Sequence, residues 1–146
     1  MNAAIQLSPP KWLNIAEHEL GVHEIPGPQS EARIVEYHSA TSLKATDDEV
    51  PWCSAFVNWC MKQAGIEGTG SAVARSWLGW GVRLKVPAFG CITVLKRGNK
   101  WQGHVGFYLG SPTPDTIRII GGNQHDSVSI ENFHRSSVLG YRWPGA

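Results

Sequence analysis

The centre of the chain reads PWCSAFVNWCMKQA, from Pro51 to Ala64. Apolar side chains recur along it at helical spacing and lie on every side of the expected helix, with Phe56 and Trp59 among the largest. Gly65 follows directly and is a typical helix stop. A helix that is apolar all round is buried inside a domain. We therefore predict a central, buried helix over this stretch, with the rest of the chain packed around it.

The two sides of this helix differ in their hydrophobic period. Before it, helical spacing predicts one helix that stops before Gly21 and another that ends near His38; a short helix over 71–80 follows it. After Pro87 the period changes to two, which indicates strands. The expected strands cover residues 91–95, 104–109, 116–120, 128–130 and 138–142. The predicted fold is α+β, with N-terminal helices packed on an antiparallel sheet of about five strands.

Length and composition narrow the function. A chain of 146 residues predicts a single domain over 1–146. The net charge is only +1, so the sequence does not indicate the basic surface that binding of nucleic acids or anionic lipids requires. No apolar run of about 18 residues exists, so no membrane insertion is expected. Residues 1–6 lack the pattern of a secretory signal, so synthesis in the cytoplasm is expected. Three cysteines, an odd number, argue against a disulfide framework.

Cys53 occupies the first turn of the central helix. Backbone N–H groups there have no helical partner, and the helix dipole favours a negative charge. Both effects lower the pKa of a thiol, and a thiolate is the form that acts as a nucleophile. Cys53 is thus a candidate nucleophile, with a small core residue as the alternative interpretation. Cys60 and Cys91 are expected to be core residues.

His104 is the candidate base for that thiol. It begins a predicted strand, in which Gly106 would leave room beside its ring. If Leu109 pairs with Thr116 across the following loop, Asn123 and Gln124 lie just beyond the strand end, next to the imidazole. An amide oxygen there could orient the ring in a Cys-His-Asn arrangement. We favour Asn123 for this role and hold Gln124 in reserve.

Three blocks of the sequence are typical of a known superfamily: PWCSAFV at 51–57, GHVGFY at 103–108 and GGNQ at 121–124. Together they resemble the NlpC/P60 and CHAP superfamily of papain-like peptidoglycan hydrolases. More narrowly, the chain is similar to small phage and prophage proteins of this type, including its start around 12–27 and its end at 140–144. The resemblance thus covers nearly the whole chain and implies the papain-like fold.

The resemblance implies a cysteine peptidase or amidase that cleaves amide bonds of bacterial peptidoglycan, with peptidoglycan as its partner. Cys53 would be the nucleophile, His104 the base and Asn123 the orienting residue. Glu24 matches a family position and, with Trp52 and Gln124, could contact the substrate. No cofactor and no metal are expected, and the protein is expected to be a monomer. Some CHAP domains bind Ca²⁺, and Asp47-Asp48-Glu49 offers carboxylates, but the helix dipole also explains that acidic segment.

The expected biological setting is a phage endolysin for host lysis, which reaches the cell wall in the host periplasm after holin release. A secreted antibacterial effector delivered by a contractile machine would use the same chemistry. Other interpretations are a thiol protease or acyltransferase acting on a substrate outside the wall, and a non-catalytic module of a phage particle. The sequence does not decide between an N-acetylmuramoyl-L-alanine amidase and an endopeptidase.

Overall fold

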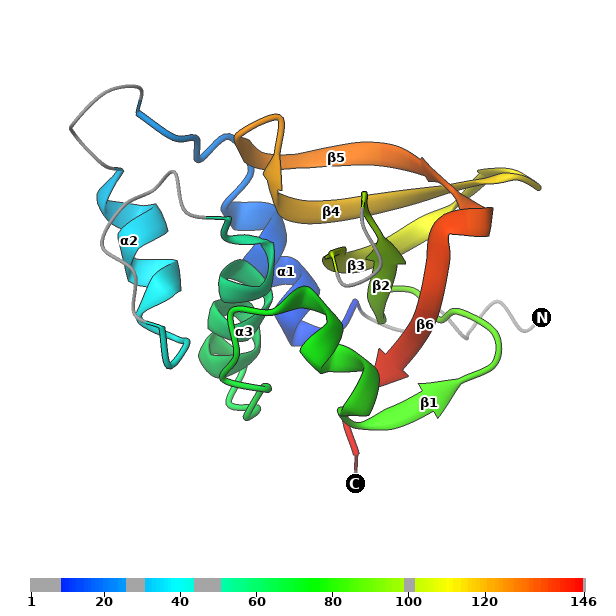
Figure 1. Cartoon of the computed structure of the whole chain (residues 1–146), viewed down its shortest axis with the longest axis horizontal. Helices are drawn as coiled ribbons and strands as arrows, with labels where there is room; N and C mark the ends of the chain where they lie inside the picture. The colour runs from blue at the N-terminus through cyan, green and yellow to red at the C-terminus, as the bar shows by residue number, and fades with distance from the viewer. Residues whose placement is uncertain (1–8, 26–30, 44–50, 99–101, 146) are drawn as a thin grey trace.

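The structure is a computed structural model that describes residues 9–25, 31–43, 51–98 and 102–145. Helices of the N-terminal part lie on one side of the molecule and the strands on the other (Figure 1). The α-helices are α1 (Lys11–His18), α2 (Ala32–His38) and α3 (Cys53–Gln63), followed by the 3-10 helix η1 (Ala74–Gly79). The strands are β1 (Val82–Leu84), β2 (Ile92–Lys96), β3 (Gly103–Thr113), β4 (Thr116–Gln124), β5 (Ser127–His134) and β6 (Val138–Trp143), with the 3-10 turn η2 (Arg135–Ser137) before β6.

Helix α3 is the buried central helix that the sequence predicts. Every residue from Cys53 to Met61 is buried, and Phe56 and Val57 have no exposed surface. The helix packs against α1 and α2 on one side and against β3 and β4 on the other. Among the described residues no helix combines the length and the apolar character needed to cross a membrane.

The described strands form one antiparallel sheet in the order β1-β6-β2-β3-β4-β5. The predicted α+β class is confirmed, with six strands in place of about five. The additional strand is β1, a three-residue edge strand paired with β6, whose exposed Val82 and Arg83 give no alternating signal. The predicted helix over 71–80 is the six-residue 3-10 helix η1, the form that short helical pieces often take.

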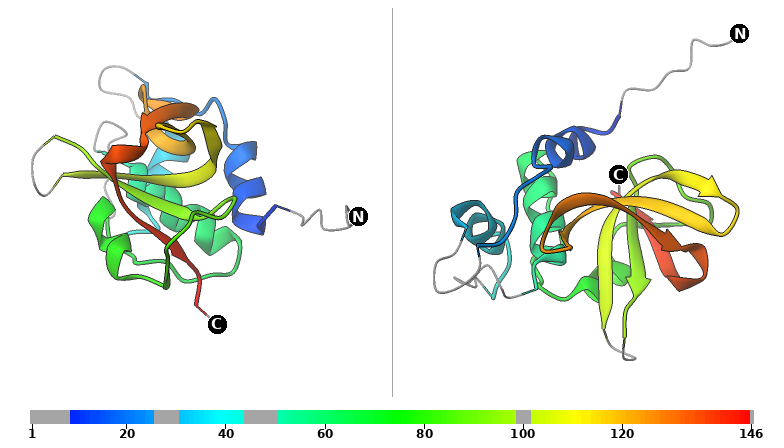
Figure 2. Two further views of the ribbon diagram at one scale, coloured as in Figure 1. Left: turned by 90° about the vertical axis from the view of Figure 1, so that its right-hand side faces the viewer. Right: turned by 90° about the horizontal axis from the view of Figure 1, so that it is seen from above.

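The sheet curves strongly, so that its two faces bury different sets of side chains (Figure 2). One face packs on the helices and includes Val94, Val105 and Phe107. The inside of the curve buries a smaller cluster of Leu95, Ile117 and Ile119. Because side chains alternate along a strand, His104 lies on the inner face, while its neighbour Val105 packs towards α3.

Candidate active site

Cys53 lies where the first turn of α3 meets strand β3. Its sulfur accepts a backbone hydrogen bond from Val105, and further ones from the backbone of Ser54 and of Cys53 itself. Backbone N–H groups point along the plane of a sheet, so the sulfur sits at the edge of β3. On this edge, the pairing of β3 with β4 begins at Phe107 and does not include Val105. The thiol therefore lies one residue along the strand from His104.

The electrostatic environment of Cys53 contains opposing effects. Burial raises the pKa of the thiol, and its side chain is only 6% exposed. The backbone donors and the positive charge of Arg97 act in the opposite direction. The predicted N–H groups at the helix start do face the sulfur and lower the pKa of the thiol. The loss of hydration on burial raises that pKa by more. The resting protein therefore holds a protonated thiol, and the expected lowering of the Cys53 pKa is wrong.

His104 is held in one orientation by Gln124. Its Nε2 lies 2.8 Å from the Oε1 atom of Gln124, and the ring stacks on Phe133 with centroids 5.3 Å apart. The amide nitrogen of Gln124 donates to the carbonyl oxygen of Ser129 at 2.8 Å, which directs the amide oxygen at the imidazole. An amide oxygen only accepts, so Nε2 of His104 carries the proton and Nδ1 is left as the basic nitrogen.

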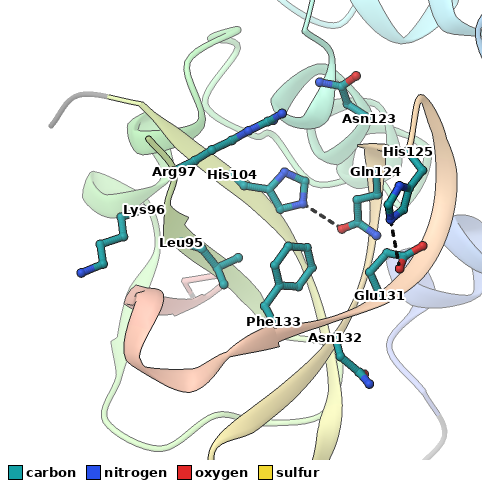
Figure 3. Close-up of a pocket in the computed structure, with 10 residues that line it drawn as sticks. All are labelled: Leu95, Lys96, Arg97, His104, Asn123, Gln124, His125, Glu131, Asn132 and Phe133. Carbon is teal, nitrogen blue, oxygen red and sulfur yellow. Dashed lines mark hydrogen bonds and ion pairs between the residues drawn. The ribbon is translucent and has the colours of Figure 1, made fainter. Parts of the chain in front are cut away.

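The partner of His104 is thus Gln124, the residue held in reserve, and not Asn123. The predicted pairing of Leu109 with Thr116 is wrong: Thr113 pairs with Thr116, and Tyr108 with Ile119. Asn123 adopts a left-handed backbone with φ of 59°, which reverses the side-chain direction at the end of β4. Figure 3 shows the Asn123 side chain pointing away from the imidazole, while Gln124 reaches it.

Two glycines of β4 make room for this arrangement. A Cβ atom on Gly121 would lie 2.6 Å from Oε1 of Gln124 and 3.5 Å from Nε2 of His104. A Cβ atom on Gly122 would lie 2.6 Å from the ring of Trp52. The GGNQ block therefore permits both the His104–Gln124 hydrogen bond and the close packing of α3 on β4.

A pocket of about 420 Å³ opens beside His104 (Figure 3). Its walls come from the end of β2, the start of β3, the β4–β5 turn and β5. Ten residues line it: Leu95, Lys96, Arg97, His104, Asn123, Gln124, His125, Glu131, Asn132 and Phe133. Burial lowers the pKa of His104 to about 4, and nearby Arg97 adds to this shift. The imidazole is therefore neutral at physiological pH and able to accept a proton.

Trp52 and Glu24 form a structural contact next to the site. Trp52 is fully buried, stacks on Tyr37 and donates a hydrogen bond from Nε1 to Glu24 at 2.9 Å. A side chain without exposed surface offers no contact to a substrate, so the expected binding role of Trp52 is wrong for this structure. Glu24 instead ties the segment after α1 to the start of α3.

Cys60 and Cys91 are core residues, as the sequence predicts, each with no exposed surface. Among the described residues no three His, Cys, Asp or Glu side chains are grouped so as to hold a metal ion. Asp47, Asp48 and Glu49, considered for Ca²⁺, lie outside the described residues. Arg97 gave no signal in the sequence, because a charged residue in a turn resembles any solvated surface residue.

Comparison with known proteins places the chain in a family. The family model of the CHAP domain matches residues 45–123, more than half of the chain. The chain belongs to the CHAP domain family. The matched segment of the CHAP domain contains Cys53, His104 and the glycines of β4.

The fold is also similar to that of a solved protein from Staphylococcus aureus subsp. aureus Mu50, described as similar to lipoprotein, NLP/P60 family. The TM-score is 0.55 and the sequence identity 14%, so the likeness concerns the fold alone. It covers 97% of this chain and 45% of that chain, which means that the CHAP protein spans less than half of its solved neighbour. No curated protein sequence matches the chain.

Proposed function

We propose that the protein is a peptidoglycan hydrolase that cleaves an amide bond of the peptide stem or cross-link, with Cys53 as nucleophile and His104 as general base. The observation that carries this proposal is the joint position of the two groups. The Cys53 sulfur accepts a hydrogen bond from the backbone of Val105, the neighbour of His104, and Gln124 orients the ring of His104. A cysteine hydrolase needs a thiol next to a base and a third group that orients the base.

The first half of the reaction forms an acyl-enzyme. Nδ1 of His104 takes the proton of the Cys53 thiol as the sulfur attacks the scissile carbonyl carbon. The raised thiol pKa and the lowered imidazole pKa favour a neutral pair at rest, so the proton moves during the attack. The backbone N–H of Cys53, at the start of α3, is the candidate donor to the developing oxyanion. The carbon–nitrogen bond then breaks, and the imidazolium gives its proton to the leaving amine.

The second half releases the product by hydrolysis. Water attacks the thioester carbon while His104 again accepts a proton, and the returning proton restores the Cys53 thiol. The Gln124 oxygen accepts the Nε2–H hydrogen bond throughout and stabilises the imidazolium that forms in each half. Gln124 is therefore a positioning residue in this mechanism.

The biological setting proposed for this activity is a phage endolysin that acts on the host cell wall. The similarity of the motif blocks to small phage and prophage proteins supports this setting. An antibacterial effector with the same chemistry is the alternative. Expression of the protein with an added periplasmic signal tests wall degradation in living cells, since lysis is expected there and not after expression in the cytoplasm.

Hydrolysis of purified sacculi tests the proposed chemistry. We expect Cys53→Ala to abolish the release of fragments and Cys60→Ala, a matched change of a buried cysteine on the same helix, to retain it. Mass spectrometry of the fragments then identifies the new amine and carboxylate, and so separates an amidase from an endopeptidase. Full activity of Cys53→Ala would contradict the proposal. Cleavage of casein but not of sacculi would instead favour a protease with a substrate outside the wall.

A further inference from the structure

Arg97 lies on the same side of the β2–β3 hairpin as His104. Leu95 is paired with His104, and the backbone N–H of Arg97 donates to the carbonyl oxygen of Gln102 at 3.3 Å, which continues the ladder. Side chains two residues apart share a face, so Arg97 is a diagonal neighbour of His104. Figure 3 shows its side chain reaching over the imidazole, whereas Lys96 points away from the pocket centre.

The guanidinium of Arg97 has no carboxylate partner among the described residues. Glu131 is the acidic residue that lines the same pocket, and it is engaged elsewhere. One of its oxygens lies 3.5 Å from Nε2 of His125, and the other accepts from the hydroxyl of Ser129 at 3.0 Å. The Arg97 cation thus lies in the pocket beside the proposed reacting groups, while the Glu131 carboxylate is held by His125 and Ser129 at the β5 wall.

Asn123, at the end of β4, supplies a second polar group to the pocket. Its left-handed backbone, uncommon for a residue other than glycine, turns its amide away from His104 (Figure 3). The side chain is half-buried and lines the same pocket as Arg97. A guanidinium and a carboxamide can both donate hydrogen bonds, and their shared ligand is an oxyanion.

We propose that Arg97 and Asn123 form a subsite for a carboxylate of the substrate, next to the amide bond that is cleaved. This inference rests on the proposed function, because it assigns the ligand of the same pocket. Peptidoglycan stems contain γ-linked and diamino acid residues, which leave free carboxylates close to their amide bonds. A bound carboxylate would pair with Arg97 and fix the peptide over His104. The subsite would thus select stems with a free carboxylate over amidated stems.

Arg97 also influences both reacting groups. Its positive charge lowers the pKa of the Cys53 thiol and of the His104 imidazole, so it is within electrostatic reach of both. A carboxylate bound to Arg97 would therefore lie close to the scissile bond and not at a remote part of the surface. This proximity is what distinguishes a specificity subsite from general attraction of an acidic polymer.

The test uses two muropeptides that differ only in the carboxylate nearest the cleaved bond, which is free in one and a carboxamide in the other. Steady-state cleavage is measured for the wild type, Arg97→Gln, Asn123→Asp and the control Arg83→Gln, which removes an exposed cation on β1. We expect the wild type to prefer the free carboxylate and Arg97→Gln to lose about tenfold in kcat/KM on that form alone, mainly through KM. Asn123→Asp, which adds a like charge, should reduce cleavage of the same form, while Arg83→Gln should match the wild type on both.

Binding separates this inference from the proposed function. Calorimetry with Cys53→Ala should give a lower Kd for the free carboxylate than for the carboxamide, and Arg97→Gln in that background should remove the difference. Equal cleavage and equal binding of both muropeptides by the wild type would overturn the subsite and leave the hydrolase intact. An equal loss on both forms in Arg97→Gln would overturn it as well. Failure of the wild type to cleave either muropeptide or sacculi would overturn the function itself, and the subsite with it.

Discussion

Removal of the Gln124 amide tests whether this residue orients the base. In the resting protein the bond from Nε2 of His104 to Oε1 of Gln124, 2.8 Å long, joins two neutral groups. During catalysis His104 becomes an imidazolium, and a hydrogen bond to a charged group contributes about 1.5–3 kcal/mol. The neutral bond of the resting protein already contributes about 1 kcal/mol, so the loss that affects kcat is the difference, about 0.5–2 kcal/mol. At about 1.4 kcal/mol for each factor of ten, Gln124→Ala should lower kcat by roughly 2- to 30-fold. KM should change little, because Gln124 is only 5% exposed.

The assay is steady-state hydrolysis of a muropeptide, with thermal unfolding of each variant as a check on folding. Ser127→Ala is the matched control, since Ser127 donates to the backbone oxygen of Gln124 at 3.0 Å in the same turn and does not touch His104. Gln124→Glu keeps an acceptor and should raise the pKa of His104, which moves the acid limb of the pH profile upwards. A kcat of Gln124→Ala equal to that of the wild type would refute the reasoning.

The remaining predictions concern pH and the glycines of β4. Because His104 must be neutral to act as base, kcat/KM should fall only as the pH approaches 4, and a limb near the ordinary value of 6.5 would contradict this. The unfolded chain binds the proton of His104 more readily than the folded protein does. The free energy of unfolding should therefore decrease by up to roughly 3 kcal/mol as the pH falls from 6.5 to 4. Chemical denaturation should show a smaller decrease in His104→Asn. Gly121→Ala should displace the flexible end of Gln124 and lower kcat at little cost in stability, whereas Gly122→Ala should clash with the rigid ring of Trp52 and lower the melting temperature. Activity of Gly121→Ala equal to the wild type, or equal melting of Gly122→Ala and wild type, would contradict these assignments.

The elements that depend on local periodicity were predictable from the sequence. Helix α3 is apolar on every side, and its burial follows from that pattern alone. The alternation in β3 correctly predicted that His104 and Val105 lie on opposite faces of the sheet. The predicted role of Gly106 is wrong, because this glycine makes room for Ile119 and Ile120 and not for the imidazole. Cys60 and Cys91 followed from the general tendency of free cysteines to be buried.

The identity of the orienting residue was not predictable, because it depends on register and on backbone handedness. The β3–β4 hairpin extends to Thr113 and Thr116, and residue 123 adopts a positive φ, so the facing amide is Gln124. Burial of Trp52 was equally hidden, since an aromatic residue beside a nucleophile suits a core and a binding groove alike. Arg97 is recognised only once the hairpin places it diagonally to His104.

The most direct measurement of the central claim is to trap the covalent intermediate. The protein is mixed with a muropeptide, quenched in acid and mapped by mass spectrometry. The account predicts an acyl group on the peptide that contains Cys53, absent from Cys53→Ala and from wild type without substrate. An acyl group on Cys60, Cys91 or a hydroxyl side chain, or product release by Cys53→Ala at the wild-type rate, would contradict it.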